Sequence, residues 1–163
     1  MRVAVVMGSL SDLEKLEPMI EILKDYNVCI DVRALSAHRA HNQLIEFINE
    51  VNNNGTEVVI AAAGMAAALP GVIASQTVLP VIGVPISSKN LEGLDALLSI
   101  VQMPSGIPVA TVAIDGSKNA AYLALQILGI KYENIKNKLV EERKIMEEKA
   151  IEANNKVIKK YNK

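Results

Sequence analysis

The two histidines of the chain lie in one short polar segment, Ser36-Ala37-His38-Arg39-Ala40-His41. Histidine both accepts and donates a proton near neutral pH, so it suits acid–base chemistry. Arginine matches a phosphate group well, because its planar guanidinium can donate two parallel hydrogen bonds. The pair His38-Arg39 therefore indicates proton transfer on a phosphorylated small molecule. His41 has no such neighbour on its C-terminal side, and we interpret it as a solvated loop residue.

A second polar segment, Gly8-Ser9-Leu10-Ser11-Asp12, follows the first apolar run of the chain. Serine and aspartate are common helix N-caps whether or not a ligand binds, so the segment has a purely structural interpretation. It also suits a phosphate cradle, since a helix N-terminus offers free N–H groups and the positive end of the helix dipole. Asp12 is better matched to ribose hydroxyls than to phosphate. The segment has neither the spacing of a Walker loop nor that of a dinucleotide-binding fingerprint.

Small residues dominate a third segment, which runs from Gly64 to Gly71 (GMAAALPG). They allow the backbone to approach a neighbour closely. That neighbour is either a tightly packed sheet or a planar ligand that takes hydrogen bonds from the backbone, and the sequence leaves both open. The polar loop Pro85–Leu91 could border the same site.

Each of these segments follows an apolar, β-branched run, which predicts its place in the fold. The sequence predicts strands at Arg2–Met7, Val28–Ala34, Glu57–Ala63, Val81–Val84 and Val109–Ile114. The spacing of apolar residues predicts helices at Ser11–Tyr26, Ala40–Asn53, Ala66–Thr77 and Leu94–Gln102, and from Ser117 onward. Strands without polar alternation are typical of a parallel sheet that is buried on both faces. We therefore expect an α/β protein: a three-layer α/β/α, flavodoxin-like, doubly wound parallel five-stranded sheet of strand order 2-1-3-4-5. Ligands of such sheets bind at the carboxyl ends of the strands, where the three segments lie.

The chain is expected to divide into a flavodoxin-like catalytic domain, residues 1–130, and a C-terminal extension of the same domain, residues 131–163. The extension is rich in lysine and has apolar residues at helical spacing, which predicts an amphipathic helical structure. It is either one or two helices packed on the domain or a helix that reaches a neighbouring subunit. The scarcity of aromatic residues and the many alanines favour close contacts between elements and support an oligomer contact.

Composition excludes several classes of function. Seventeen Lys and Arg residues against 18 Asp and Glu residues give a net charge of -1, which argues against a general nucleic-acid binder. No apolar stretch is long enough to span a membrane, no signal-peptide pattern follows the first strand, and no Cys/His cluster indicates a metal site. The one cysteine, Cys29, is interpreted as a small buried hydrophobic residue of a cytoplasmic protein.

Five blocks of the sequence resemble, in order, the class I 5-(carboxyamino)imidazole ribonucleotide mutases of bacteria and archaea, the catalytic-subunit family of phosphoribosylaminoimidazole carboxylase. The blocks are Gly8–Asp12 (GSLSD), Ser36–Arg39 (SAHR), Ala63–Gly71 (AGMAAALPG), Leu79–Pro85 (LPVIGVP) and Ser99–Ile114 (SIVQMPSGIPVATVAI). The resemblance covers the chain from about Arg2 to Leu128. One block alone would be unspecific, whereas five in the family's order are highly specific.

The resemblance implies an isomerase of purine (IMP) biosynthesis that converts 5-(carboxyamino)imidazole ribonucleotide to 5-amino-1-(5-phosphoribosyl)imidazole-4-carboxylate. The implied route is loss of carbon dioxide, which stays trapped, and recarboxylation at ring carbon four, with His38 as the catalytic proton shuttle. It also implies that the ribose phosphate is held by Ser9, Ser11, Asp12 and Arg39. The wider substrate-binding set adds Ser36, Gly64, Met65, Ala66 and Leu69. The family needs no metal, ATP or organic cofactor, and its subunits form a homo-octamer.

The chain departs from the family pattern at three places. It has Ala68 where the family often has histidine, Ala40-His41 where Thr-Pro is common, and Ala96 where serine is common. Three other functions stay open: direct carboxylation of aminoimidazole ribonucleotide by carbon dioxide (class II), a carboxylase domain of another cofactor pathway, and a non-enzymatic module that binds a nucleotide or flavin. The SAHR block and the small-residue segment favour class I, and few loop aromatics are available to stack on a flavin ring.

Overall fold

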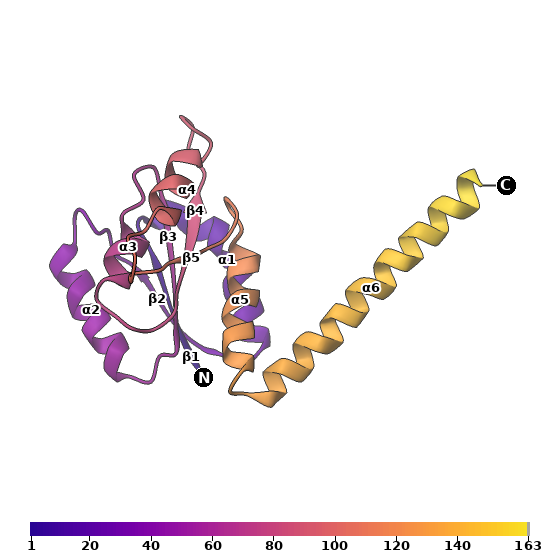
Figure 1. The fold of residues 1–163 in the computed structure, drawn as a ribbon, viewed down its shortest axis with the longest axis horizontal. Coiled ribbons are helices and arrows are strands. Elements are labelled where there is room, and N and C mark those ends of the chain that lie inside the picture. Colours follow the sequence, from indigo (N-terminus) through magenta and orange to yellow (C-terminus); the bar gives the residue numbers. More distant parts are fainter. Residues whose placement is uncertain (163) are drawn as a thin grey trace.

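The structure, a computed structural model that describes residues 1–162, is built on a five-stranded parallel sheet with helices on both faces (Figure 1). The strands are β1 (Arg2–Met7), β2 (Cys29–Ala34), β3 (Val58–Gly64), β4 (Val81–Ile86) and β5 (Ala110–Thr111). Their order is β2-β1-β3-β4-β5, and every neighbouring pair is parallel. The predicted fold class and strand order are therefore confirmed.

The helices alternate with the strands along the chain. They are the 3-10 turn η1 (Leu10–Asp12) and the α-helices α1 (Leu13–Asp25), α2 (His41–Asn53), α3 (Leu69–Ala74), α4 (Leu94–Val101), α5 (Ser117–Gly129) and α6 (Glu133–Tyr161). Helices α1 and α5 cover one face of the sheet, and α2, α3 and α4 cover the other (Figure 1). In the described part of the chain, no helix has both the length and the apolar character needed to cross a membrane.

Alternation of side chains along the central strands builds two separate cores. In β1, Val3, Val5 and Met7 pack against α1 and α5, whereas Ala4 and Val6 pack against α2, α3 and α4. Successive side chains of a strand point to opposite faces, so a continuous apolar run supplies both cores at once. The central strands β1, β3 and β4 are buried along nearly their whole length. Their carboxyl ends therefore have a rigid base.

The edge strand β2 differs from the expectation of burial on both faces. Its residues are exposed or half-buried, and Cys29 is exposed. The prediction that Cys29 is a small buried residue is wrong, because β2 pairs only with β1 and no further strand covers its outer edge. An apolar run does not by itself distinguish a central strand from an edge strand.

Two elements are shorter than predicted. Strand β5 has two residues, since it pairs with β4 only at Ala110 and Thr111 before the chain turns away from the sheet. Helix α3 begins at Leu69 rather than at Ala66, with Pro70 in its first turn, where a proline needs no N–H partner. The residues before it form tight turns instead of helix, and they lie at the carboxyl end of β3.

Helix α6 leaves the domain after its first turns and extends far beyond it (Figure 1). Ile135 is its one buried residue, and every residue from Arg143 to Asn162 is exposed. The helix is anchored at its start: Lys131 Nζ lies 2.8 Å from Glu57 Oε1, and Lys138 Nζ donates to the Asp25 carbonyl at 2.6 Å. Packing along the domain, one of the two arrangements expected for residues 131–163, therefore holds only for the first turns of α6.

A substitution in the central sheet tests this packing. A Cβ added at Gly83 of β4 would overlap the Ile100 side chain of α4 and lie 2.9 Å from Val109 Cγ1. We expect Gly83→Ala to lower the free energy of unfolding by about 1–3 kcal/mol, because overpacking forces rotamers and backbone to shift. Urea denaturation measures the change. Gly8→Ala is the control, since its nearest new neighbour, the Ala62 carbonyl oxygen, lies at 3.9 Å. Equal stability of the two variants would contradict the packing at Gly83.

Candidate active site

A cavity of about 610 Å³ opens at the carboxyl edge of the sheet, where the loops that follow β1, β2, β3 and β4 meet. It is lined by all ten residues that the sequence marks as site candidates: His38, Ser9, Ser11, Asp12, Ser36, Arg39, Gly64, Met65, Ala66 and Leu69. The structure brings together segments from three separate loops. Ser87 and Ser88 also line the cavity. The sequence analysis did not name them individually, although it expected their loop, Pro85–Leu91, to border the site.

The loop after β1 enters α1 through the 3-10 turn η1. Ser9 Oγ accepts hydrogen bonds from Ser11 N–H at 3.3 Å and from Ser11 Oγ at 2.8 Å. Ser9 is therefore an N-cap, as the structural interpretation of this segment held. Asp12 makes no side-chain cap to α1. Its carboxylate accepts a long contact from Ser11 Oγ, at 3.3 Å, and lines the cavity.

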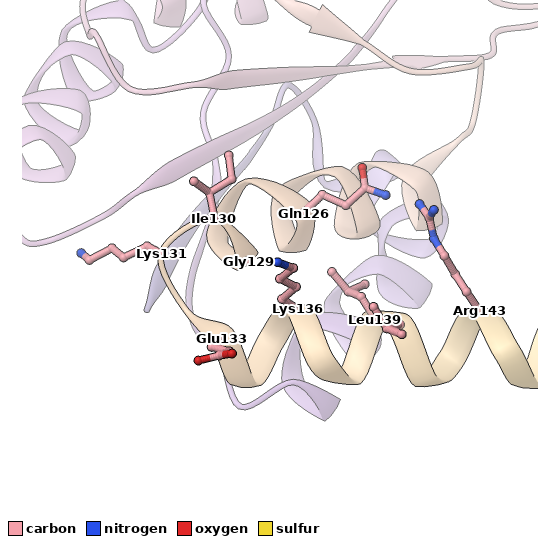
Figure 2. Close-up of a pocket in the computed structure, with 9 residues that line it drawn as sticks. Gln126, Gly129, Ile130, Lys131, Glu133, Lys136, Leu139 and Arg143 are labelled. Atoms are coloured by element: carbon pink, nitrogen blue, oxygen red, sulfur yellow. The ribbon is translucent and has the colours of Figure 1, made fainter.

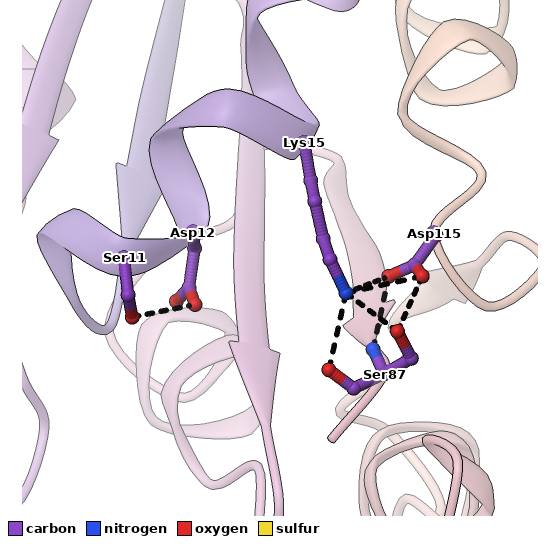
Figure 3. Close-up of polar contacts among 5 residues, drawn as sticks. All are labelled: Ser11, Asp12, Lys15, Ser87 and Asp115. Carbon is purple, nitrogen blue, oxygen red and sulfur yellow. Dashed lines mark hydrogen bonds and ion pairs between the residues drawn. The ribbon is translucent and has the colours of Figure 1, made fainter. Parts of the chain in front are cut away.

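Partial burial shifts the pKa of the Asp12 carboxyl. Desolvation raises its pKa above the ordinary value, although hydrogen bonds from the Ser11 side chain and the Ser9 backbone and the positive charge of Lys15 oppose that rise. Figure 3 shows Ser11 and Asp12 on the turn and Lys15 farther along α1. A half-buried carboxylate without a cap or an ion pair of its own is disposed to accept hydrogen bonds from a ligand's hydroxyl groups.

The loop after β2 presents His38 and Arg39 on a tight turn. The Ser36 carbonyl closes the turn by accepting from Arg39 N–H at 3.3 Å and from Ala40 N–H at 2.9 Å. Both side chains are exposed at the rim of the cavity. Within residues 1–162, neither side chain has a hydrogen bond or ion pair to the protein. Imidazole and guanidinium are therefore both available to a bound molecule.

The small-residue segment after β3 forms the floor of the cavity. Gly64 pairs with Ile86 at the end of the sheet, and a Cβ there would lie 3.1 Å from the Ile86 carbonyl oxygen. Met65 follows in a left-handed conformation with φ of 57°, which costs a non-glycine residue about 1–2 kcal/mol. Its side chain is 60% exposed. Strained backbone of this kind is concentrated at functional sites.

A second cavity, of about 750 Å³, lies between α5 and the start of α6 (Figure 2). Its lining includes the cations Lys131, Lys136 and Arg143 together with Leu139 and Val140. It contains no histidine, and Lys131 ties it to Glu57, just before β3 begins. This groove lies away from the carboxyl edge, and it is not the candidate active site.

The candidate site brings serine hydroxyls, a guanidinium and a carboxylate together beside an imidazole. Among the described residues, no group of three His, Cys, Asp or Glu side chains could hold a metal ion. Fold and site together define a doubly wound α/β protein with a pocket suited to a small phosphorylated ligand.

Comparison with known proteins identifies the family. A sequence model described as AIR carboxylase matches residues 2–149, and the chain belongs to this family. It is 57% identical over 150 residues to the N5-carboxyaminoimidazole ribonucleotide mutase of Pyrococcus horikoshii, covering 92% of this chain and 85% of that one. The Methanocaldococcus jannaschii mutase is 54% identical over 155 residues, covering 95% and 96%. The Bacillus subtilis mutase is 44% identical over 158 residues, covering 96% and 98%.

A solved structure agrees with these relatives. The crystal structure of Treponema denticola PurE has a TM-score of 0.87 to this chain at 29% identity, covering 95% of this chain and 97% of that one. The fold of the whole chain, and not only its motifs, is thus that of a known family member. The resemblance seen in the five sequence blocks is confirmed.

The raised pKa of Asp12 predicts a stability effect. A folded-state pKa above the ordinary value means that folding disfavours the carboxylate, so a penalty is present at neutral pH and disappears as pH falls below about 4. We expect Asp12→Asn to raise the thermal midpoint at pH 7 and to approach the wild type as pH falls toward 4. Calorimetry at both pH values measures this. Asp25→Asn, at an exposed position of α1, is the control. A lower midpoint for Asp12→Asn at pH 7 would contradict the desolvation of Asp12.

Proposed function

We propose that the chain is an N5-carboxyaminoimidazole ribonucleotide mutase of purine biosynthesis, an isomerase that moves a carboxyl group within its substrate. The name of its relatives at 44–57% identity supports this activity. The observation that carries the mechanism is the lining of the cavity. Asp12, His38 and Arg39 are its ionisable side chains among the described residues, and only His38 is of a type that exchanges a proton readily near neutral pH.

His38 acts twice in the proposed reaction. As imidazolium it gives a proton to the exocyclic nitrogen of the substrate while the N–C bond to the carboxylate breaks, which releases carbon dioxide and aminoimidazole ribonucleotide. Ring carbon four then attacks the trapped carbon dioxide, and the neutral imidazole removes the proton that this carbon carried. The histidine ends as it began, so the isomerisation consumes neither proton nor cofactor.

The polar loops bind the ribose phosphate end of the substrate. Arg39 and the hydroxyls of Ser9 and Ser11 are donors for the phosphate. Asp12 accepts hydrogen bonds from the ribose hydroxyls. The turn at Ser36 holds His38 and Arg39 side by side, so binding of the phosphate brings the proton carrier to the imidazole ring.

The apolar end of the cavity retains carbon dioxide. Ala63, Ala67 and Leu69 are buried there, and Gly64, Met65 and Ala66 offer backbone and small side chains to a planar ring. A pocket poor in water slows hydration of the gas, and keeping both fragments together gives a large effective molarity. Ala68 stands where a second histidine is common, so in this chain the proton chemistry belongs to His38.

Direct carboxylation of aminoimidazole ribonucleotide by carbon dioxide is the alternative reaction, and the mutase names of the relatives count against it. A paired assay without ATP separates the two. One arm supplies the carboxyamino substrate, and the other supplies aminoimidazole ribonucleotide with low bicarbonate. We expect rapid formation of the carbon-carboxylated product in the first arm only. Efficient conversion in the second arm would replace the mutase by a carboxylase.

A substitution tests the role of His38. We expect His38→Asn to fold normally and to lower kcat by roughly 10²- to 10⁴-fold, the usual contribution of general acid–base catalysis. His41→Asn is the matched control, since His41 is exposed at the start of α2 and does not line the cavity. Steady-state kinetics of the two variants measures the difference. Near-normal turnover of His38→Asn would remove His38 from the mechanism.

We also propose that the protein is a cytoplasmic homo-oligomer, an octamer, in which α6 contacts a neighbouring copy. One stripe of α6 continues the face that packs on the domain: Ile135, Leu139, Met146, Ala150, Ala153 and Val157. Beyond Leu139 this stripe is exposed, although most of the stability of a helix in a protein comes from packing of such an apolar face. A second copy of the chain suits it, because an apolar stripe is stabilised by an apolar partner and the groove in Figure 2 exposes the side chains of Ile130 and Val140.

The assembly role of α6 predicts the effect of added charge. We expect Met146→Lys/Val157→Lys to reduce the mass measured by light scattering after gel filtration, because two ammonium groups would be buried at the interface. Glu148→Gln/Asn155→Lys is the control, since it adds the same charge on a different side of α6. A wild-type monomer would contradict the oligomer, and an unchanged mass of the first variant would contradict the α6 contact.

A further inference from the structure

A cluster of three side chains lies at the wall of the cavity, and two of its members, Lys15 and Asp115, belong to none of the sequence motifs. Lys15 of α1, Ser87 after β4 and Asp115 after β5 converge on one point (Figure 3). Lys15 Nζ lies 3.1 Å from each Asp115 carboxylate oxygen, 3.1 Å from the Ser87 carbonyl oxygen and 2.5 Å from Ser87 Oγ. The cluster joins residues separated by up to 100 positions in the sequence.

Every polar group of Ser87 forms a hydrogen bond. Its N–H donates to Asp115 Oδ1 at 2.9 Å, and its hydroxyl donates to Asp115 Oδ2 at 2.5 Å. Its carbonyl and hydroxyl oxygens both accept from Lys15. A residue bound at N–H, C=O and side chain at once has little freedom in position or rotamer. Charge-assisted hydrogen bonds of this kind are shorter and stronger than neutral ones.

The carboxylate at the centre of the cluster is itself fixed. Asp115 has a left-handed φ of 54°, and its N–H donates to the Pro85 carbonyl at 2.8 Å. Burial opposes its ionisation, but hydrogen bonds from Ser87 and Lys15 outweigh burial and hold the Asp115 pKa below its ordinary value. The cluster is therefore an ion pair at neutral pH, with Ser87 between its two members.

The position of Ser87 decides the shape of the cavity. It follows Ile86, which pairs with Gly64 at the floor, and Ser87 and Ser88 line the cavity next to the buried side chains of Ala63 and Ile86. Ala63 and Ile86 give this part of the pocket an apolar surface beside the two serine hydroxyls. A small apolar gas favours such a region over water. A gap in the wall at Ser87 would open this region.

We propose that Lys15 is a positioning residue: through Asp115 it holds the Ser87–Ser88 segment as a closed wall that keeps carbon dioxide in the cavity between the two steps of the reaction. Lys15 does not line the cavity, so its proposed role is to act through Asp115 and Ser87. Its effect is on partitioning. With the wall closed, the carbon dioxide recombines at ring carbon four, and with the wall mobile, carbon dioxide and aminoimidazole ribonucleotide escape. This inference rests on the proposed mutase activity.

The test compares Lys15→Met with Lys24→Met, a control that removes the same charge at an exposed position of the same helix. The first readout is the ratio of released aminoimidazole ribonucleotide to carbon-carboxylated product, corrected for spontaneous loss of carbon dioxide without enzyme. We expect this ratio to rise several-fold in Lys15→Met and to stay at the wild-type value in Lys24→Met. A lower kcat with an unchanged ratio would reduce Lys15 to a merely structural role and overturn the proposal.

The second readout does not depend on activity. Hydrogen exchange of peptides covering residues 86–93 should become faster in Lys15→Met, because the Ser87 N–H loses the partner that Lys15 holds in place. Unchanged exchange would overturn the positioning step. Asp115→Asn is the second variant, since asparagine tolerates a left-handed φ, and it should reproduce both effects without adding to those of Lys15→Met. If the wild type forms no product from the carboxyamino substrate, the proposed function fails, while the exchange measurement still decides whether Lys15 positions Ser87.

Discussion

The buried parallel ladder of β1, β3 and β4 is the constraint on which the rest of the structure depends. Backbone groups in a dry core must be hydrogen-bonded, so these strands stay in register up to their carboxyl ends. The chain can diverge into loops only at that edge, and polar side chains from distant positions are forced to meet there. His38, Asp12 and Met65 share a cavity for this reason. The position of the site residues therefore follows from where the paired strands end.

Local patterns predicted the sheet and its strand order, and together with the family resemblance they named ten of the residues that line the cavity. Ser36–Arg39 and Gly8–Asp12 each follow an apolar run directly, so strand ends could be read from the residues alone. Local patterns did not predict the features that depend on tertiary contacts. The exposure of Cys29 depends on what covers β2, and the length of β5 depends on where it leaves β4. The pairing of Lys15 with Asp115 leaves no local signal, because it exists only after three loops have converged.

Several residues at or next to the site adopt unfavourable local states. Met65 and Asp115 adopt left-handed backbone conformations, and Asp12 is desolvated. None of these would persist in an isolated loop, and each is held by a rigid neighbour: β3 for Met65, the Ser87–Lys15 contacts for Asp115, and η1 for Asp12. The stability that the two cores supply offsets the cost of these local states at the carboxyl edge, as is common for sites that must be preorganised.

The exposed part of helix α6 differs from the rest of the chain in what stabilises it. The sheet and its helices are ordered by their own cores, whereas the exposed part of α6 has no core of its own to stabilise it. In the proposed assembly, association through α6 would couple binding to ordering of its exposed part. Such association carries the thermodynamic marks of a folding reaction: an entropic opposition from ordering the chain and a large negative heat-capacity change from burying its apolar stripe. In that assembly the order of the last part of the chain would depend on the protein concentration as well as on its sequence.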